Sequence, residues 1–210
     1  LLLAYDESER LDIIRLHLQF IENKTQMSYV LGLKETALPT QYSIKHGVNS
    51  GDEVCISYES GARYLGGALE TPERVIRHGK GKVYDEQGRL LFEGLWENDF
   101  PVFGKYIFNE DYYYEGTLKD YRFTGKGTLF YKGNVLYEGE WQDFKFSGRG
   151  KLYYESGIIK YEGDFRNSIK HGNGKSYYTD GKLYHIGSYN NGAIDGRGSM
   201  YWRNGNLMFE

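Results

Sequence analysis

Residues 137–150 read Tyr-Glu-Gly-Glu-Trp-Gln-Asp-Phe-Lys-Phe-Ser-Gly-Arg-Gly, and this stretch predicts a β-hairpin. Tyr137, Gly139 and Trp141 alternate with two glutamates, so the rings and the glycine point to one face of a strand and the carboxylates to the other. A polar turn follows, and the Gly-x-Gly step at 148–150 lies on the next strand. The stretch is therefore one unit of two strands and a turn.

The same unit recurs along the chain, which indicates tandem repeats. An aromatic-x-Gly step recurs at intervals of 22 to 28 residues, and it begins at Tyr64, Phe92, Tyr114, Tyr137 and Tyr161. The step is less regular at 184–187, and it starts again at Phe209. Gly-x-Gly steps fall between them, at 79–81, 125–127, 148–150, 172–174 and 196–198. At 104–106 we interpret the second glycine of this step as lost. A single turn glycine is the third marker: Gly88, Gly133, Gly157, Gly181 and Gly205.

Such short hairpins cannot bury their own apolar faces, so they must stack on one another. The predicted fold is an all-β repeat protein, an elongated twisted single-layer antiparallel sheet of tandem hairpins. Glycines on the apolar face leave space for the aromatic ring of a neighbouring strand. The repeat pattern also continues weakly toward the N-terminus, with a degenerate unit at about 44–66 and a remnant at 29–32.

The units at 137–150 and 161–174 resemble the MORN repeat, whose pattern is Tyr-x-Gly, then His-Gly-x-Gly, an aromatic run and Asp-Gly. The resemblance covers residues 64–210 well and 29–63 weakly. The domain organisation that it implies is an N-terminal helix and linker at 1–28, degenerate MORN-like units at 29–66 and a MORN repeat array at 67–210.

The N-terminal segment has a different pattern. Asp6 and Glu9 have the spacing of a capping box, and apolar residues then follow a helical period, which predicts one α-helix over about 7–23. This helix is expected to cap the first hairpin and to seal the sheet edge. Two alternatives are a helix that binds a partner or dimerises, and a helix that lies on a membrane surface.

The composition excludes several classes. The net charge is -3, without the basic balance of nucleic-acid binders. Cys55 is the one cysteine, so no disulfide can form within the chain, which fits a reducing compartment. No run of 18 apolar residues is present, so no membrane-spanning helix is expected.

No catalytic or metal-binding constellation is apparent. His46, His78 and His171 occupy one repeat position, roughly 10 Å apart for two strand spacings, whereas zinc ligands lie at about 2.1 Å from the metal. Glutamates likewise form a ladder, not a cleft: Glu93, Glu115, Glu138 and Glu162. Nucleophile-elbow and Walker-type motifs are missing from the sequence. We therefore expect no enzyme activity, no cofactor and no metal.

Two sets of residues are candidates for binding. Basic residues in or near the Gly-x-Gly steps predict a basic stripe, unless they pair with the glutamate ladder: Lys80, Lys105, Lys126, Arg149 and Arg197. Aromatic residues on the sheet are candidates for docking a partner, unless they serve the packing of the sheet itself: Trp96, Phe123, Trp141, Phe144, Phe165, Tyr189 and Trp202.

The resemblance implies a non-catalytic scaffold or adaptor in a cytoskeletal or ciliary (axonemal) assembly. The expected partners are helical or extended protein segments within a large complex, with a homodimer or an anionic membrane surface as alternatives and no nucleic acid. The expected location is cytoplasmic, at the cytoskeleton, the cilium or the cytoplasmic face of a membrane.

Two alternative functions remain open. One is a membrane-tethering or phosphoinositide-binding module. The other is the targeting region of a larger enzyme, such as a SET-domain methyltransferase or a lipid kinase. Phe209-Glu210 reads as the start of a further unit, so we expect the chain to continue or a partner strand to cover this edge.

Overall fold

A computed structural model describes residues 41–45, 53–58 and 60–210. Every helix or strand element in these ranges is a β-strand. They divide into two compact units, with the boundary between Arg122 and Phe123. The predicted helix at 7–23, the remnant unit at 29–32 and His46 lie outside the described residues. The predicted boundaries at 28 and 66 stay predictions.

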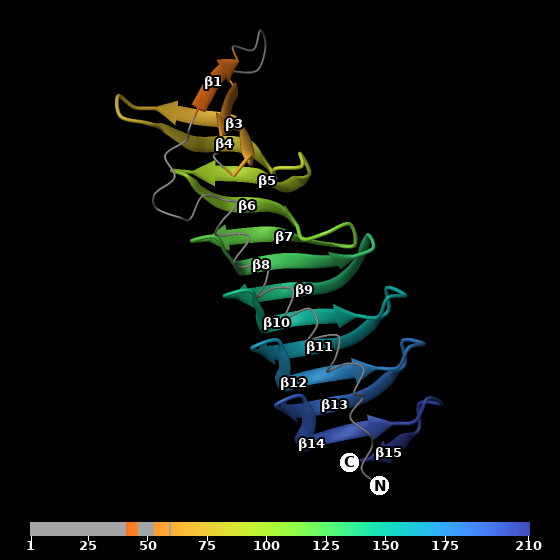
Figure 1. Cartoon of the computed structure of the whole chain (residues 1–210). Coiled ribbons are helices and arrows are strands. Elements are labelled where there is room, and N and C mark those ends of the chain that lie inside the picture. Colours follow the sequence, from red (N-terminus) through yellow and green to blue (C-terminus); the bar gives the residue numbers. More distant parts are fainter. Residues whose placement is uncertain (1–40, 46–52, 59) are drawn as a thin grey trace. The chain divides into compact units, whose positions relative to one another are not determined.

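The N-terminal unit is an antiparallel sheet in which each strand pairs with the next one in the chain (Figure 1). Its strands are β1 (Gln41–Lys45), β2 (Glu53–Ser57), β3 (Arg63–Glu70), β4 (Val75–Tyr84), β5 (Leu90–Glu97), β6 (Phe100–Ile107) and β7 (Tyr112–Lys119).

The C-terminal unit repeats the same arrangement, again with sequential antiparallel pairing. Its strands are β8 (Arg122–Tyr131), β9 (Asn134–Gln142), β10 (Lys145–Tyr153), β11 (Ile159–Arg166), β12 (Ile169–Tyr177), β13 (Leu183–Asn190), β14 (Ala193–Tyr201) and β15 (Leu207–Phe209). The strands of each unit lie side by side in one layer (Figure 1). The predicted fold class, a single-layer antiparallel sheet of tandem hairpins, is confirmed. In the described ranges, no helix is long and apolar enough to cross a bilayer.

The core of each unit is a row of rings over a row of glycines. Tyr137 is fully buried, and a β-carbon added to Gly139 or Gly150 would come within 2.6 Å of its hydroxyl or ring atoms. Tyr161 stands in the same way over Gly163 and Gly174. We call the face that carries the rings the inner face. Neighbours of each glycine point to the opposite, outer face, because side chains alternate along a strand.

Each buried tyrosine of this row also closes a short hydrogen bond. The hydroxyl donates to the carbonyl oxygen three residues later, at 2.8 Å from Tyr137 to Glu140 and at 3.0 Å from Tyr161 to Asp164. Tyr114 makes the same bond to Thr117 at 2.9 Å. Burial raises the pKa of all three tyrosines. The hydroxyl thus stays protonated and donates to a backbone group that the ring covers.

At 184–187 the structure corrects the sequence interpretation. His185, not Tyr184, occupies the ring position, because Gly187 pairs with Gly198 and His185 pairs with Met200. His185 is 1% exposed, and its Nδ1 lies 2.8 Å from the Tyr189 hydroxyl. The unit is therefore regular, with an imidazole in place of the phenol ring.

The interpretation of 104–106 was also wrong in one detail. Gly104 pairs with Gly94 and Gly116, which is the position of the second glycine of the Gly-x-Gly step. The first glycine is the one replaced, by Val102. Other repeats place three residues opposite one at this bulge, as between Phe146 and Gly150. Here one residue fewer is inserted, so the left-handed conformation that requires glycine is not needed.

The hairpin turns at one end of the strands link successive repeats. Asn167-Ser168 has positive φ at both residues (53° and 63°), the geometry of a two-residue type I′ turn. The Ser168 N–H donates to the Phe146 carbonyl at 2.9 Å, and the Ser168 hydroxyl accepts the Phe146 N–H at 3.1 Å. This two-point clamp joins residues 22 apart, and it ties the turn at 167–168 to the preceding hairpin.

Candidate functional site

A groove crosses strands β8 to β13 on the outer face of the C-terminal unit, with a volume of about 900 Å³. Its floor is the glycine row: Gly127, Gly139, Gly150, Gly163, Gly174 and Gly187. On either side of this row, the residues before and after each glycine form two walls. The floor is backbone without side chains because the rings of the inner face occupy the other side of the same glycines.

On β9, β10 and β11 the two walls present the same sign of charge, and on β8 and β12 one wall residue alone is charged. On β9 the pair is Glu138 and Glu140, and on β10 it is Arg149 and Lys151. Glu162 and Asp164 form a third pair on β11, whereas β8 and β12 carry one charge each, Lys126 beside Thr128 and Lys175 beside Asn173. From β8 to β12 the groove therefore carries bands of positive, negative, positive, negative and positive charge.

Ion pairs along the walls join neighbouring bands. Lys151 lies 3.3 Å from Glu138, with 44% and 42% of the side chains exposed. Lys175 lies 3.2 Å from Glu162, and Arg149, which is 90% exposed, lies 3.9 Å from Asp164. Exposed pairs of this kind stabilise a protein by about 0–1 kcal/mol each. The wall charges thus gain little from one another and remain exposed to solvent.

Tyrosines hold two of the wall carboxylates in place. Tyr153 donates to Glu138 at 2.6 Å, and Tyr177 donates to Glu162 at 2.6 Å. These hydrogen bonds, more than the neighbouring lysines, lower the pKa of both glutamates. The negative bands on β9 and β11 therefore remain ionised and fixed in position.

The predicted basic stripe is split by the structure. Lys126 and Arg149 lie in one wall of the groove, and Arg197 and Lys80 occupy the same repeat position on β14 and β4. Lys105 belongs to the other row, with Lys82, because it pairs with Glu93 and Glu115. Its ammonium lies 3.8 Å from the Tyr113 ring centroid. Lys82, Lys151 and Lys175 make the ladder pairs with glutamates.

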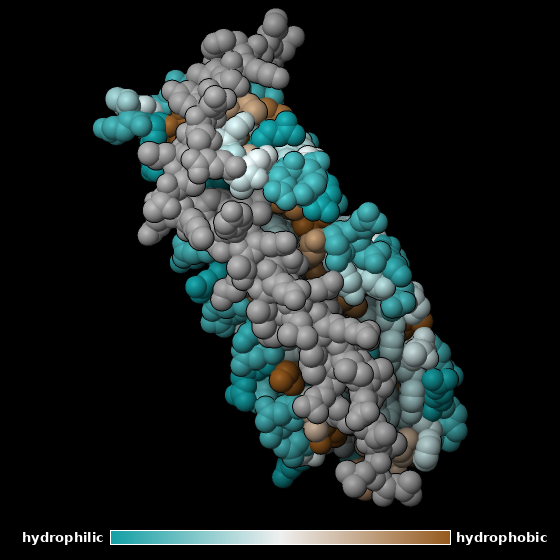
Figure 2. Space-filling model, in the orientation of Figure 1, coloured by the Kyte–Doolittle hydropathy of each residue, from teal (hydrophilic) through white to brown (hydrophobic). Residues whose placement is uncertain are grey.

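Six of the seven aromatic candidates are buried in the inner-face packing, where rings meet edge to face: Trp96, Phe123, Trp141, Phe144, Phe165 and Tyr189. Trp202 is 54% exposed. Hydrophilic side chains dominate the visible surface of the described residues, with isolated hydrophobic ones between them (Figure 2). Of the seven, only Trp202 offers its ring to a partner in this arrangement, and the docking role of the set stays a prediction.

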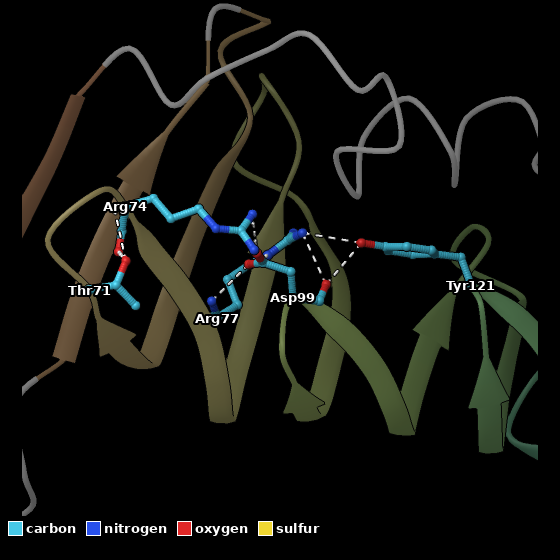
Figure 3. Close-up of polar contacts among 5 residues, drawn as sticks. All are labelled: Thr71, Arg74, Arg77, Asp99 and Tyr121. Carbon is cyan, nitrogen blue, oxygen red and sulfur yellow. Dashed lines mark hydrogen bonds and ion pairs between the residues drawn. The ribbon is translucent and has the colours of Figure 1, made fainter.

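A buried arginine cluster in the N-terminal unit has no counterpart among the predicted residues (Figure 3). The Arg77 side chain is 6% exposed; its Nε donates to the Asp99 carboxylate at 3.2 Å and a terminal nitrogen to the Asp99 carbonyl at 3.1 Å. That nitrogen also reaches the Tyr121 hydroxyl at 3.3 Å, and the guanidinium lies 4.5 Å from the Trp96 ring. The signal for this contact in the sequence is the spacing, because Arg77 precedes the turn residue Asp99 by 22 positions.

The cluster joins β4 to the turns that follow β5 and β7 through one buried charge. Burial alone would lower the pKa of Arg77, but Tyr58, Tyr121 and Asp99 raise it above its ordinary value. The guanidinium therefore stays charged. In the ranges that the structure describes, no group of three or more His, Cys, Asp or Glu side chains could hold a metal ion.

Family models match the chain in four places, all within residues 114–207. The MORN repeat matches 114–135, 161–182 and 185–207, and the MORN repeat variant matches 146–167. The chain contains MORN repeats. Three of the four matches begin at a residue of the ring row, and the one that begins at His185 agrees with the strand register. MORN repeats form modules that bind proteins or associate with membranes, and the family is generally non-catalytic. A comparison with curated proteins found no match.

Proposed function

We propose that this chain is a non-catalytic scaffold that holds a protein partner in the groove of its C-terminal unit, within a cytoskeletal or ciliary assembly. The observation that carries the proposal is the groove itself, with a bare glycine floor between two charged walls. Six strands at a spacing of about 4.8 Å give it a length of roughly 24 Å. This length suits a segment of a protein better than a small molecule, which a closed pocket would surround.

The alternation of charge favours a protein over an anionic membrane. A lipid surface attracts clustered basic residues, with a contribution of about 1 kcal/mol for each Lys or Arg. In the groove, the acidic band of β9 separates Lys126 from Arg149, and the acidic band of β11 follows. A row of anionic headgroups would meet repulsion at every second strand, whereas a polypeptide can carry both signs.

Site-specific photo-cross-linking tests this function. A benzoylphenylalanine replaces Asn173, an exposed and uncharged residue of the groove wall, in the full-length protein in its native cells. The matched control places it at Glu155, an exposed turn residue outside the groove lining. We expect a cross-linked protein from position 173 and not from position 155, and mass spectrometry of the product tests the cytoskeletal or ciliary assignment.

Equal products from both positions, or no product from position 173, would contradict a docking role for the groove. A cross-link to a protein outside the cytoskeleton and cilium would keep the docking role and reject the proposed assembly.

A further inference from the structure

We infer that the segment held in the groove is an α-helix that carries a stripe of charged side chains alternating in sign at every turn. This inference rests on the proposed docking function and specifies the partner. The observation behind it is the pairing of like charges across the groove, with Glu138 facing Glu140 and Arg149 facing Lys151.

The bands on β9, β10 and β11 can each hold one partner charge from both sides, and those on β8 and β12 hold it from one side. The two wall residues of a strand are two positions apart, so their α-carbons are roughly 6.8 Å apart. A charged partner side chain that lies between two like charges of the walls meets two groups of the sign opposite to its own. A partner lysine over β9 would lie between Glu138 and Glu140, and a partner glutamate over β10 between Arg149 and Lys151. Charge-assisted hydrogen bonds of this kind are the stronger ones in proteins.

The distance between bands selects a helix. Adjacent strands lie about 4.8 Å apart. Residues three or four apart on one face of a helix are separated by roughly 4.5–6 Å along its axis. Same-face residues of an extended segment are about 6.8 Å apart, so they lose register with the bands after two strands. A helix maintains the match along all five charged bands.

The full stripe can be written from the bands. From β8 to β12 the groove is positive, negative, positive, negative and positive, so the helix presents acidic, basic, acidic, basic and acidic residues. At positions i, i+4, i+7, i+11 and i+14 these residues span about 21 Å. The five bands span four strand spacings, roughly 19 Å. The two lengths agree to within half a strand spacing.

Binding of synthetic peptides tests the inference with the intact chain. The probe is a stapled helical 17-residue peptide with Glu, Lys, Glu, Lys and Glu at those five positions. The first control has the same composition and staple with like charges grouped along the stripe. The second has the alternating sequence with two prolines that prevent a helix. Calorimetry measures affinity, and amide chemical shifts of the floor glycines report the site.

The alternating helix is expected to bind at least tenfold more tightly than either control and to shift Gly139, Gly150 and Gly163. The R149Q/K151Q variant, which removes the β10 band, should weaken this peptide about tenfold. K132Q/K182Q changes the charge equally in two turns outside the groove lining and should leave the affinity unchanged.

Equal affinity of the alternating and grouped helices would overturn the charge stripe, and equal affinity of the proline peptide would overturn the helix. In either case, shifts at the floor glycines would leave the docking groove standing. If no peptide binds, the inference fails, while the cross-linking from position 173 still decides on the proposed function by itself.

Discussion

The Asp99 carboxylate holds Arg77 by two hydrogen bonds. It accepts one from the Arg77 backbone N–H at 2.8 Å and one from the side-chain Nε at 3.2 Å. The Asp99 N–H in turn donates to the Arg77 carbonyl at 2.9 Å. Phe146 and Ser168 make the same backbone contacts in the C-terminal unit. The two units thus use one clamp with different chemistry, an ion pair in one and a serine hydroxyl in the other.

The D99A variant should lose about 3–5 kcal/mol of unfolding free energy, because it leaves the buried Arg77 guanidinium without its carboxylate. Chemical denaturation of the full chain measures this loss. The matched control is R77F/D99S, which copies the Phe146–Ser168 clamp and should lose much less. A double variant as unstable as D99A would contradict the equivalence of the two clamps.

Replacing Gly150 by alanine should destabilise the C-terminal unit by about 3 kcal/mol, at the upper end of overpacking costs. The new β-carbon would meet the Tyr137 ring, which is stacked on Phe146 at 3.7 Å and cannot move aside. Gly157 has open space around it and positive φ (82°), so G157A should cost only about 1–2 kcal/mol of backbone strain.

A double-mutant cycle separates the clash with Tyr137 from a general effect of G150A. If Tyr137 is the obstacle, Y137L and G150A together should cost less than the sum of the two single variants. Additive losses in thermal unfolding would place the obstacle elsewhere.

The clamp at Ser168 predicts an ordering of two variants. Both S168A and S168G leave the buried Phe146 N–H without its side-chain acceptor, at a cost of about 1–3 kcal/mol. Alanine additionally keeps the strain of positive φ (63°), which glycine relieves by about 1 kcal/mol. S168A should therefore be the less stable of the two in denaturant titrations. The reverse order would show that strain at this turn is negligible.

His185 makes the stability of the C-terminal unit depend on pH. Burial, and secondarily Lys170, lower its pKa in the folded state below the ordinary value of 6.5. The unfolded chain therefore binds a proton that the folded chain does not, so stability is fully present above pH about 6.5 and decreases as the pH falls below it. Thermal unfolding between pH 7.5 and 5 measures the decrease.

The H185Y variant is the control for this pH effect. Tyrosine restores the ring found at Tyr137 and Tyr161, and its hydroxyl can donate to the carbonyl three residues later, as theirs do. The variant should fold, and its stability should fall less between pH 7 and 5.5 than that of the parent chain. Parallel pH curves would mean that other groups, chiefly carboxylates, account for the loss.

The hairpin array was predictable because its markers are local. Tyr137, Gly139 and Gly150 share one face by simple alternation, and the register places them together. The errors came from insertions within strands. Sequence spacing cannot show that Val102 replaces a bulge glycine, because the bulge next to Gly104 is one residue shorter than in the other repeats. Nor can it show that an imidazole takes the ring position at 185.

The candidate site was only partly predictable. Lys126 and Arg149 were recognised as a repeating basic position, but the groove also depends on Glu140 and on which residues face each other across the glycines. Long-range contacts were missed for a related reason. Arg77 and Asp99 meet because the turn that contains Asp99 packs against the preceding hairpin. In the sequence alone, a polar residue such as Arg77 just before a Gly-x-Gly step looks solvent-exposed.

The charge bands of the groove also set how a bound segment can move. Because the signs recur at every second strand, a partner displaced by one repeat would meet the same charges, so several docked positions would be nearly degenerate. The sequence breaks this translational symmetry at the β13 end, where the 38%-exposed Ile186 takes a wall position in place of a charged residue. A partner with one apolar residue at that end would be locked in a single register, whereas a purely charged one would be free to step along the groove.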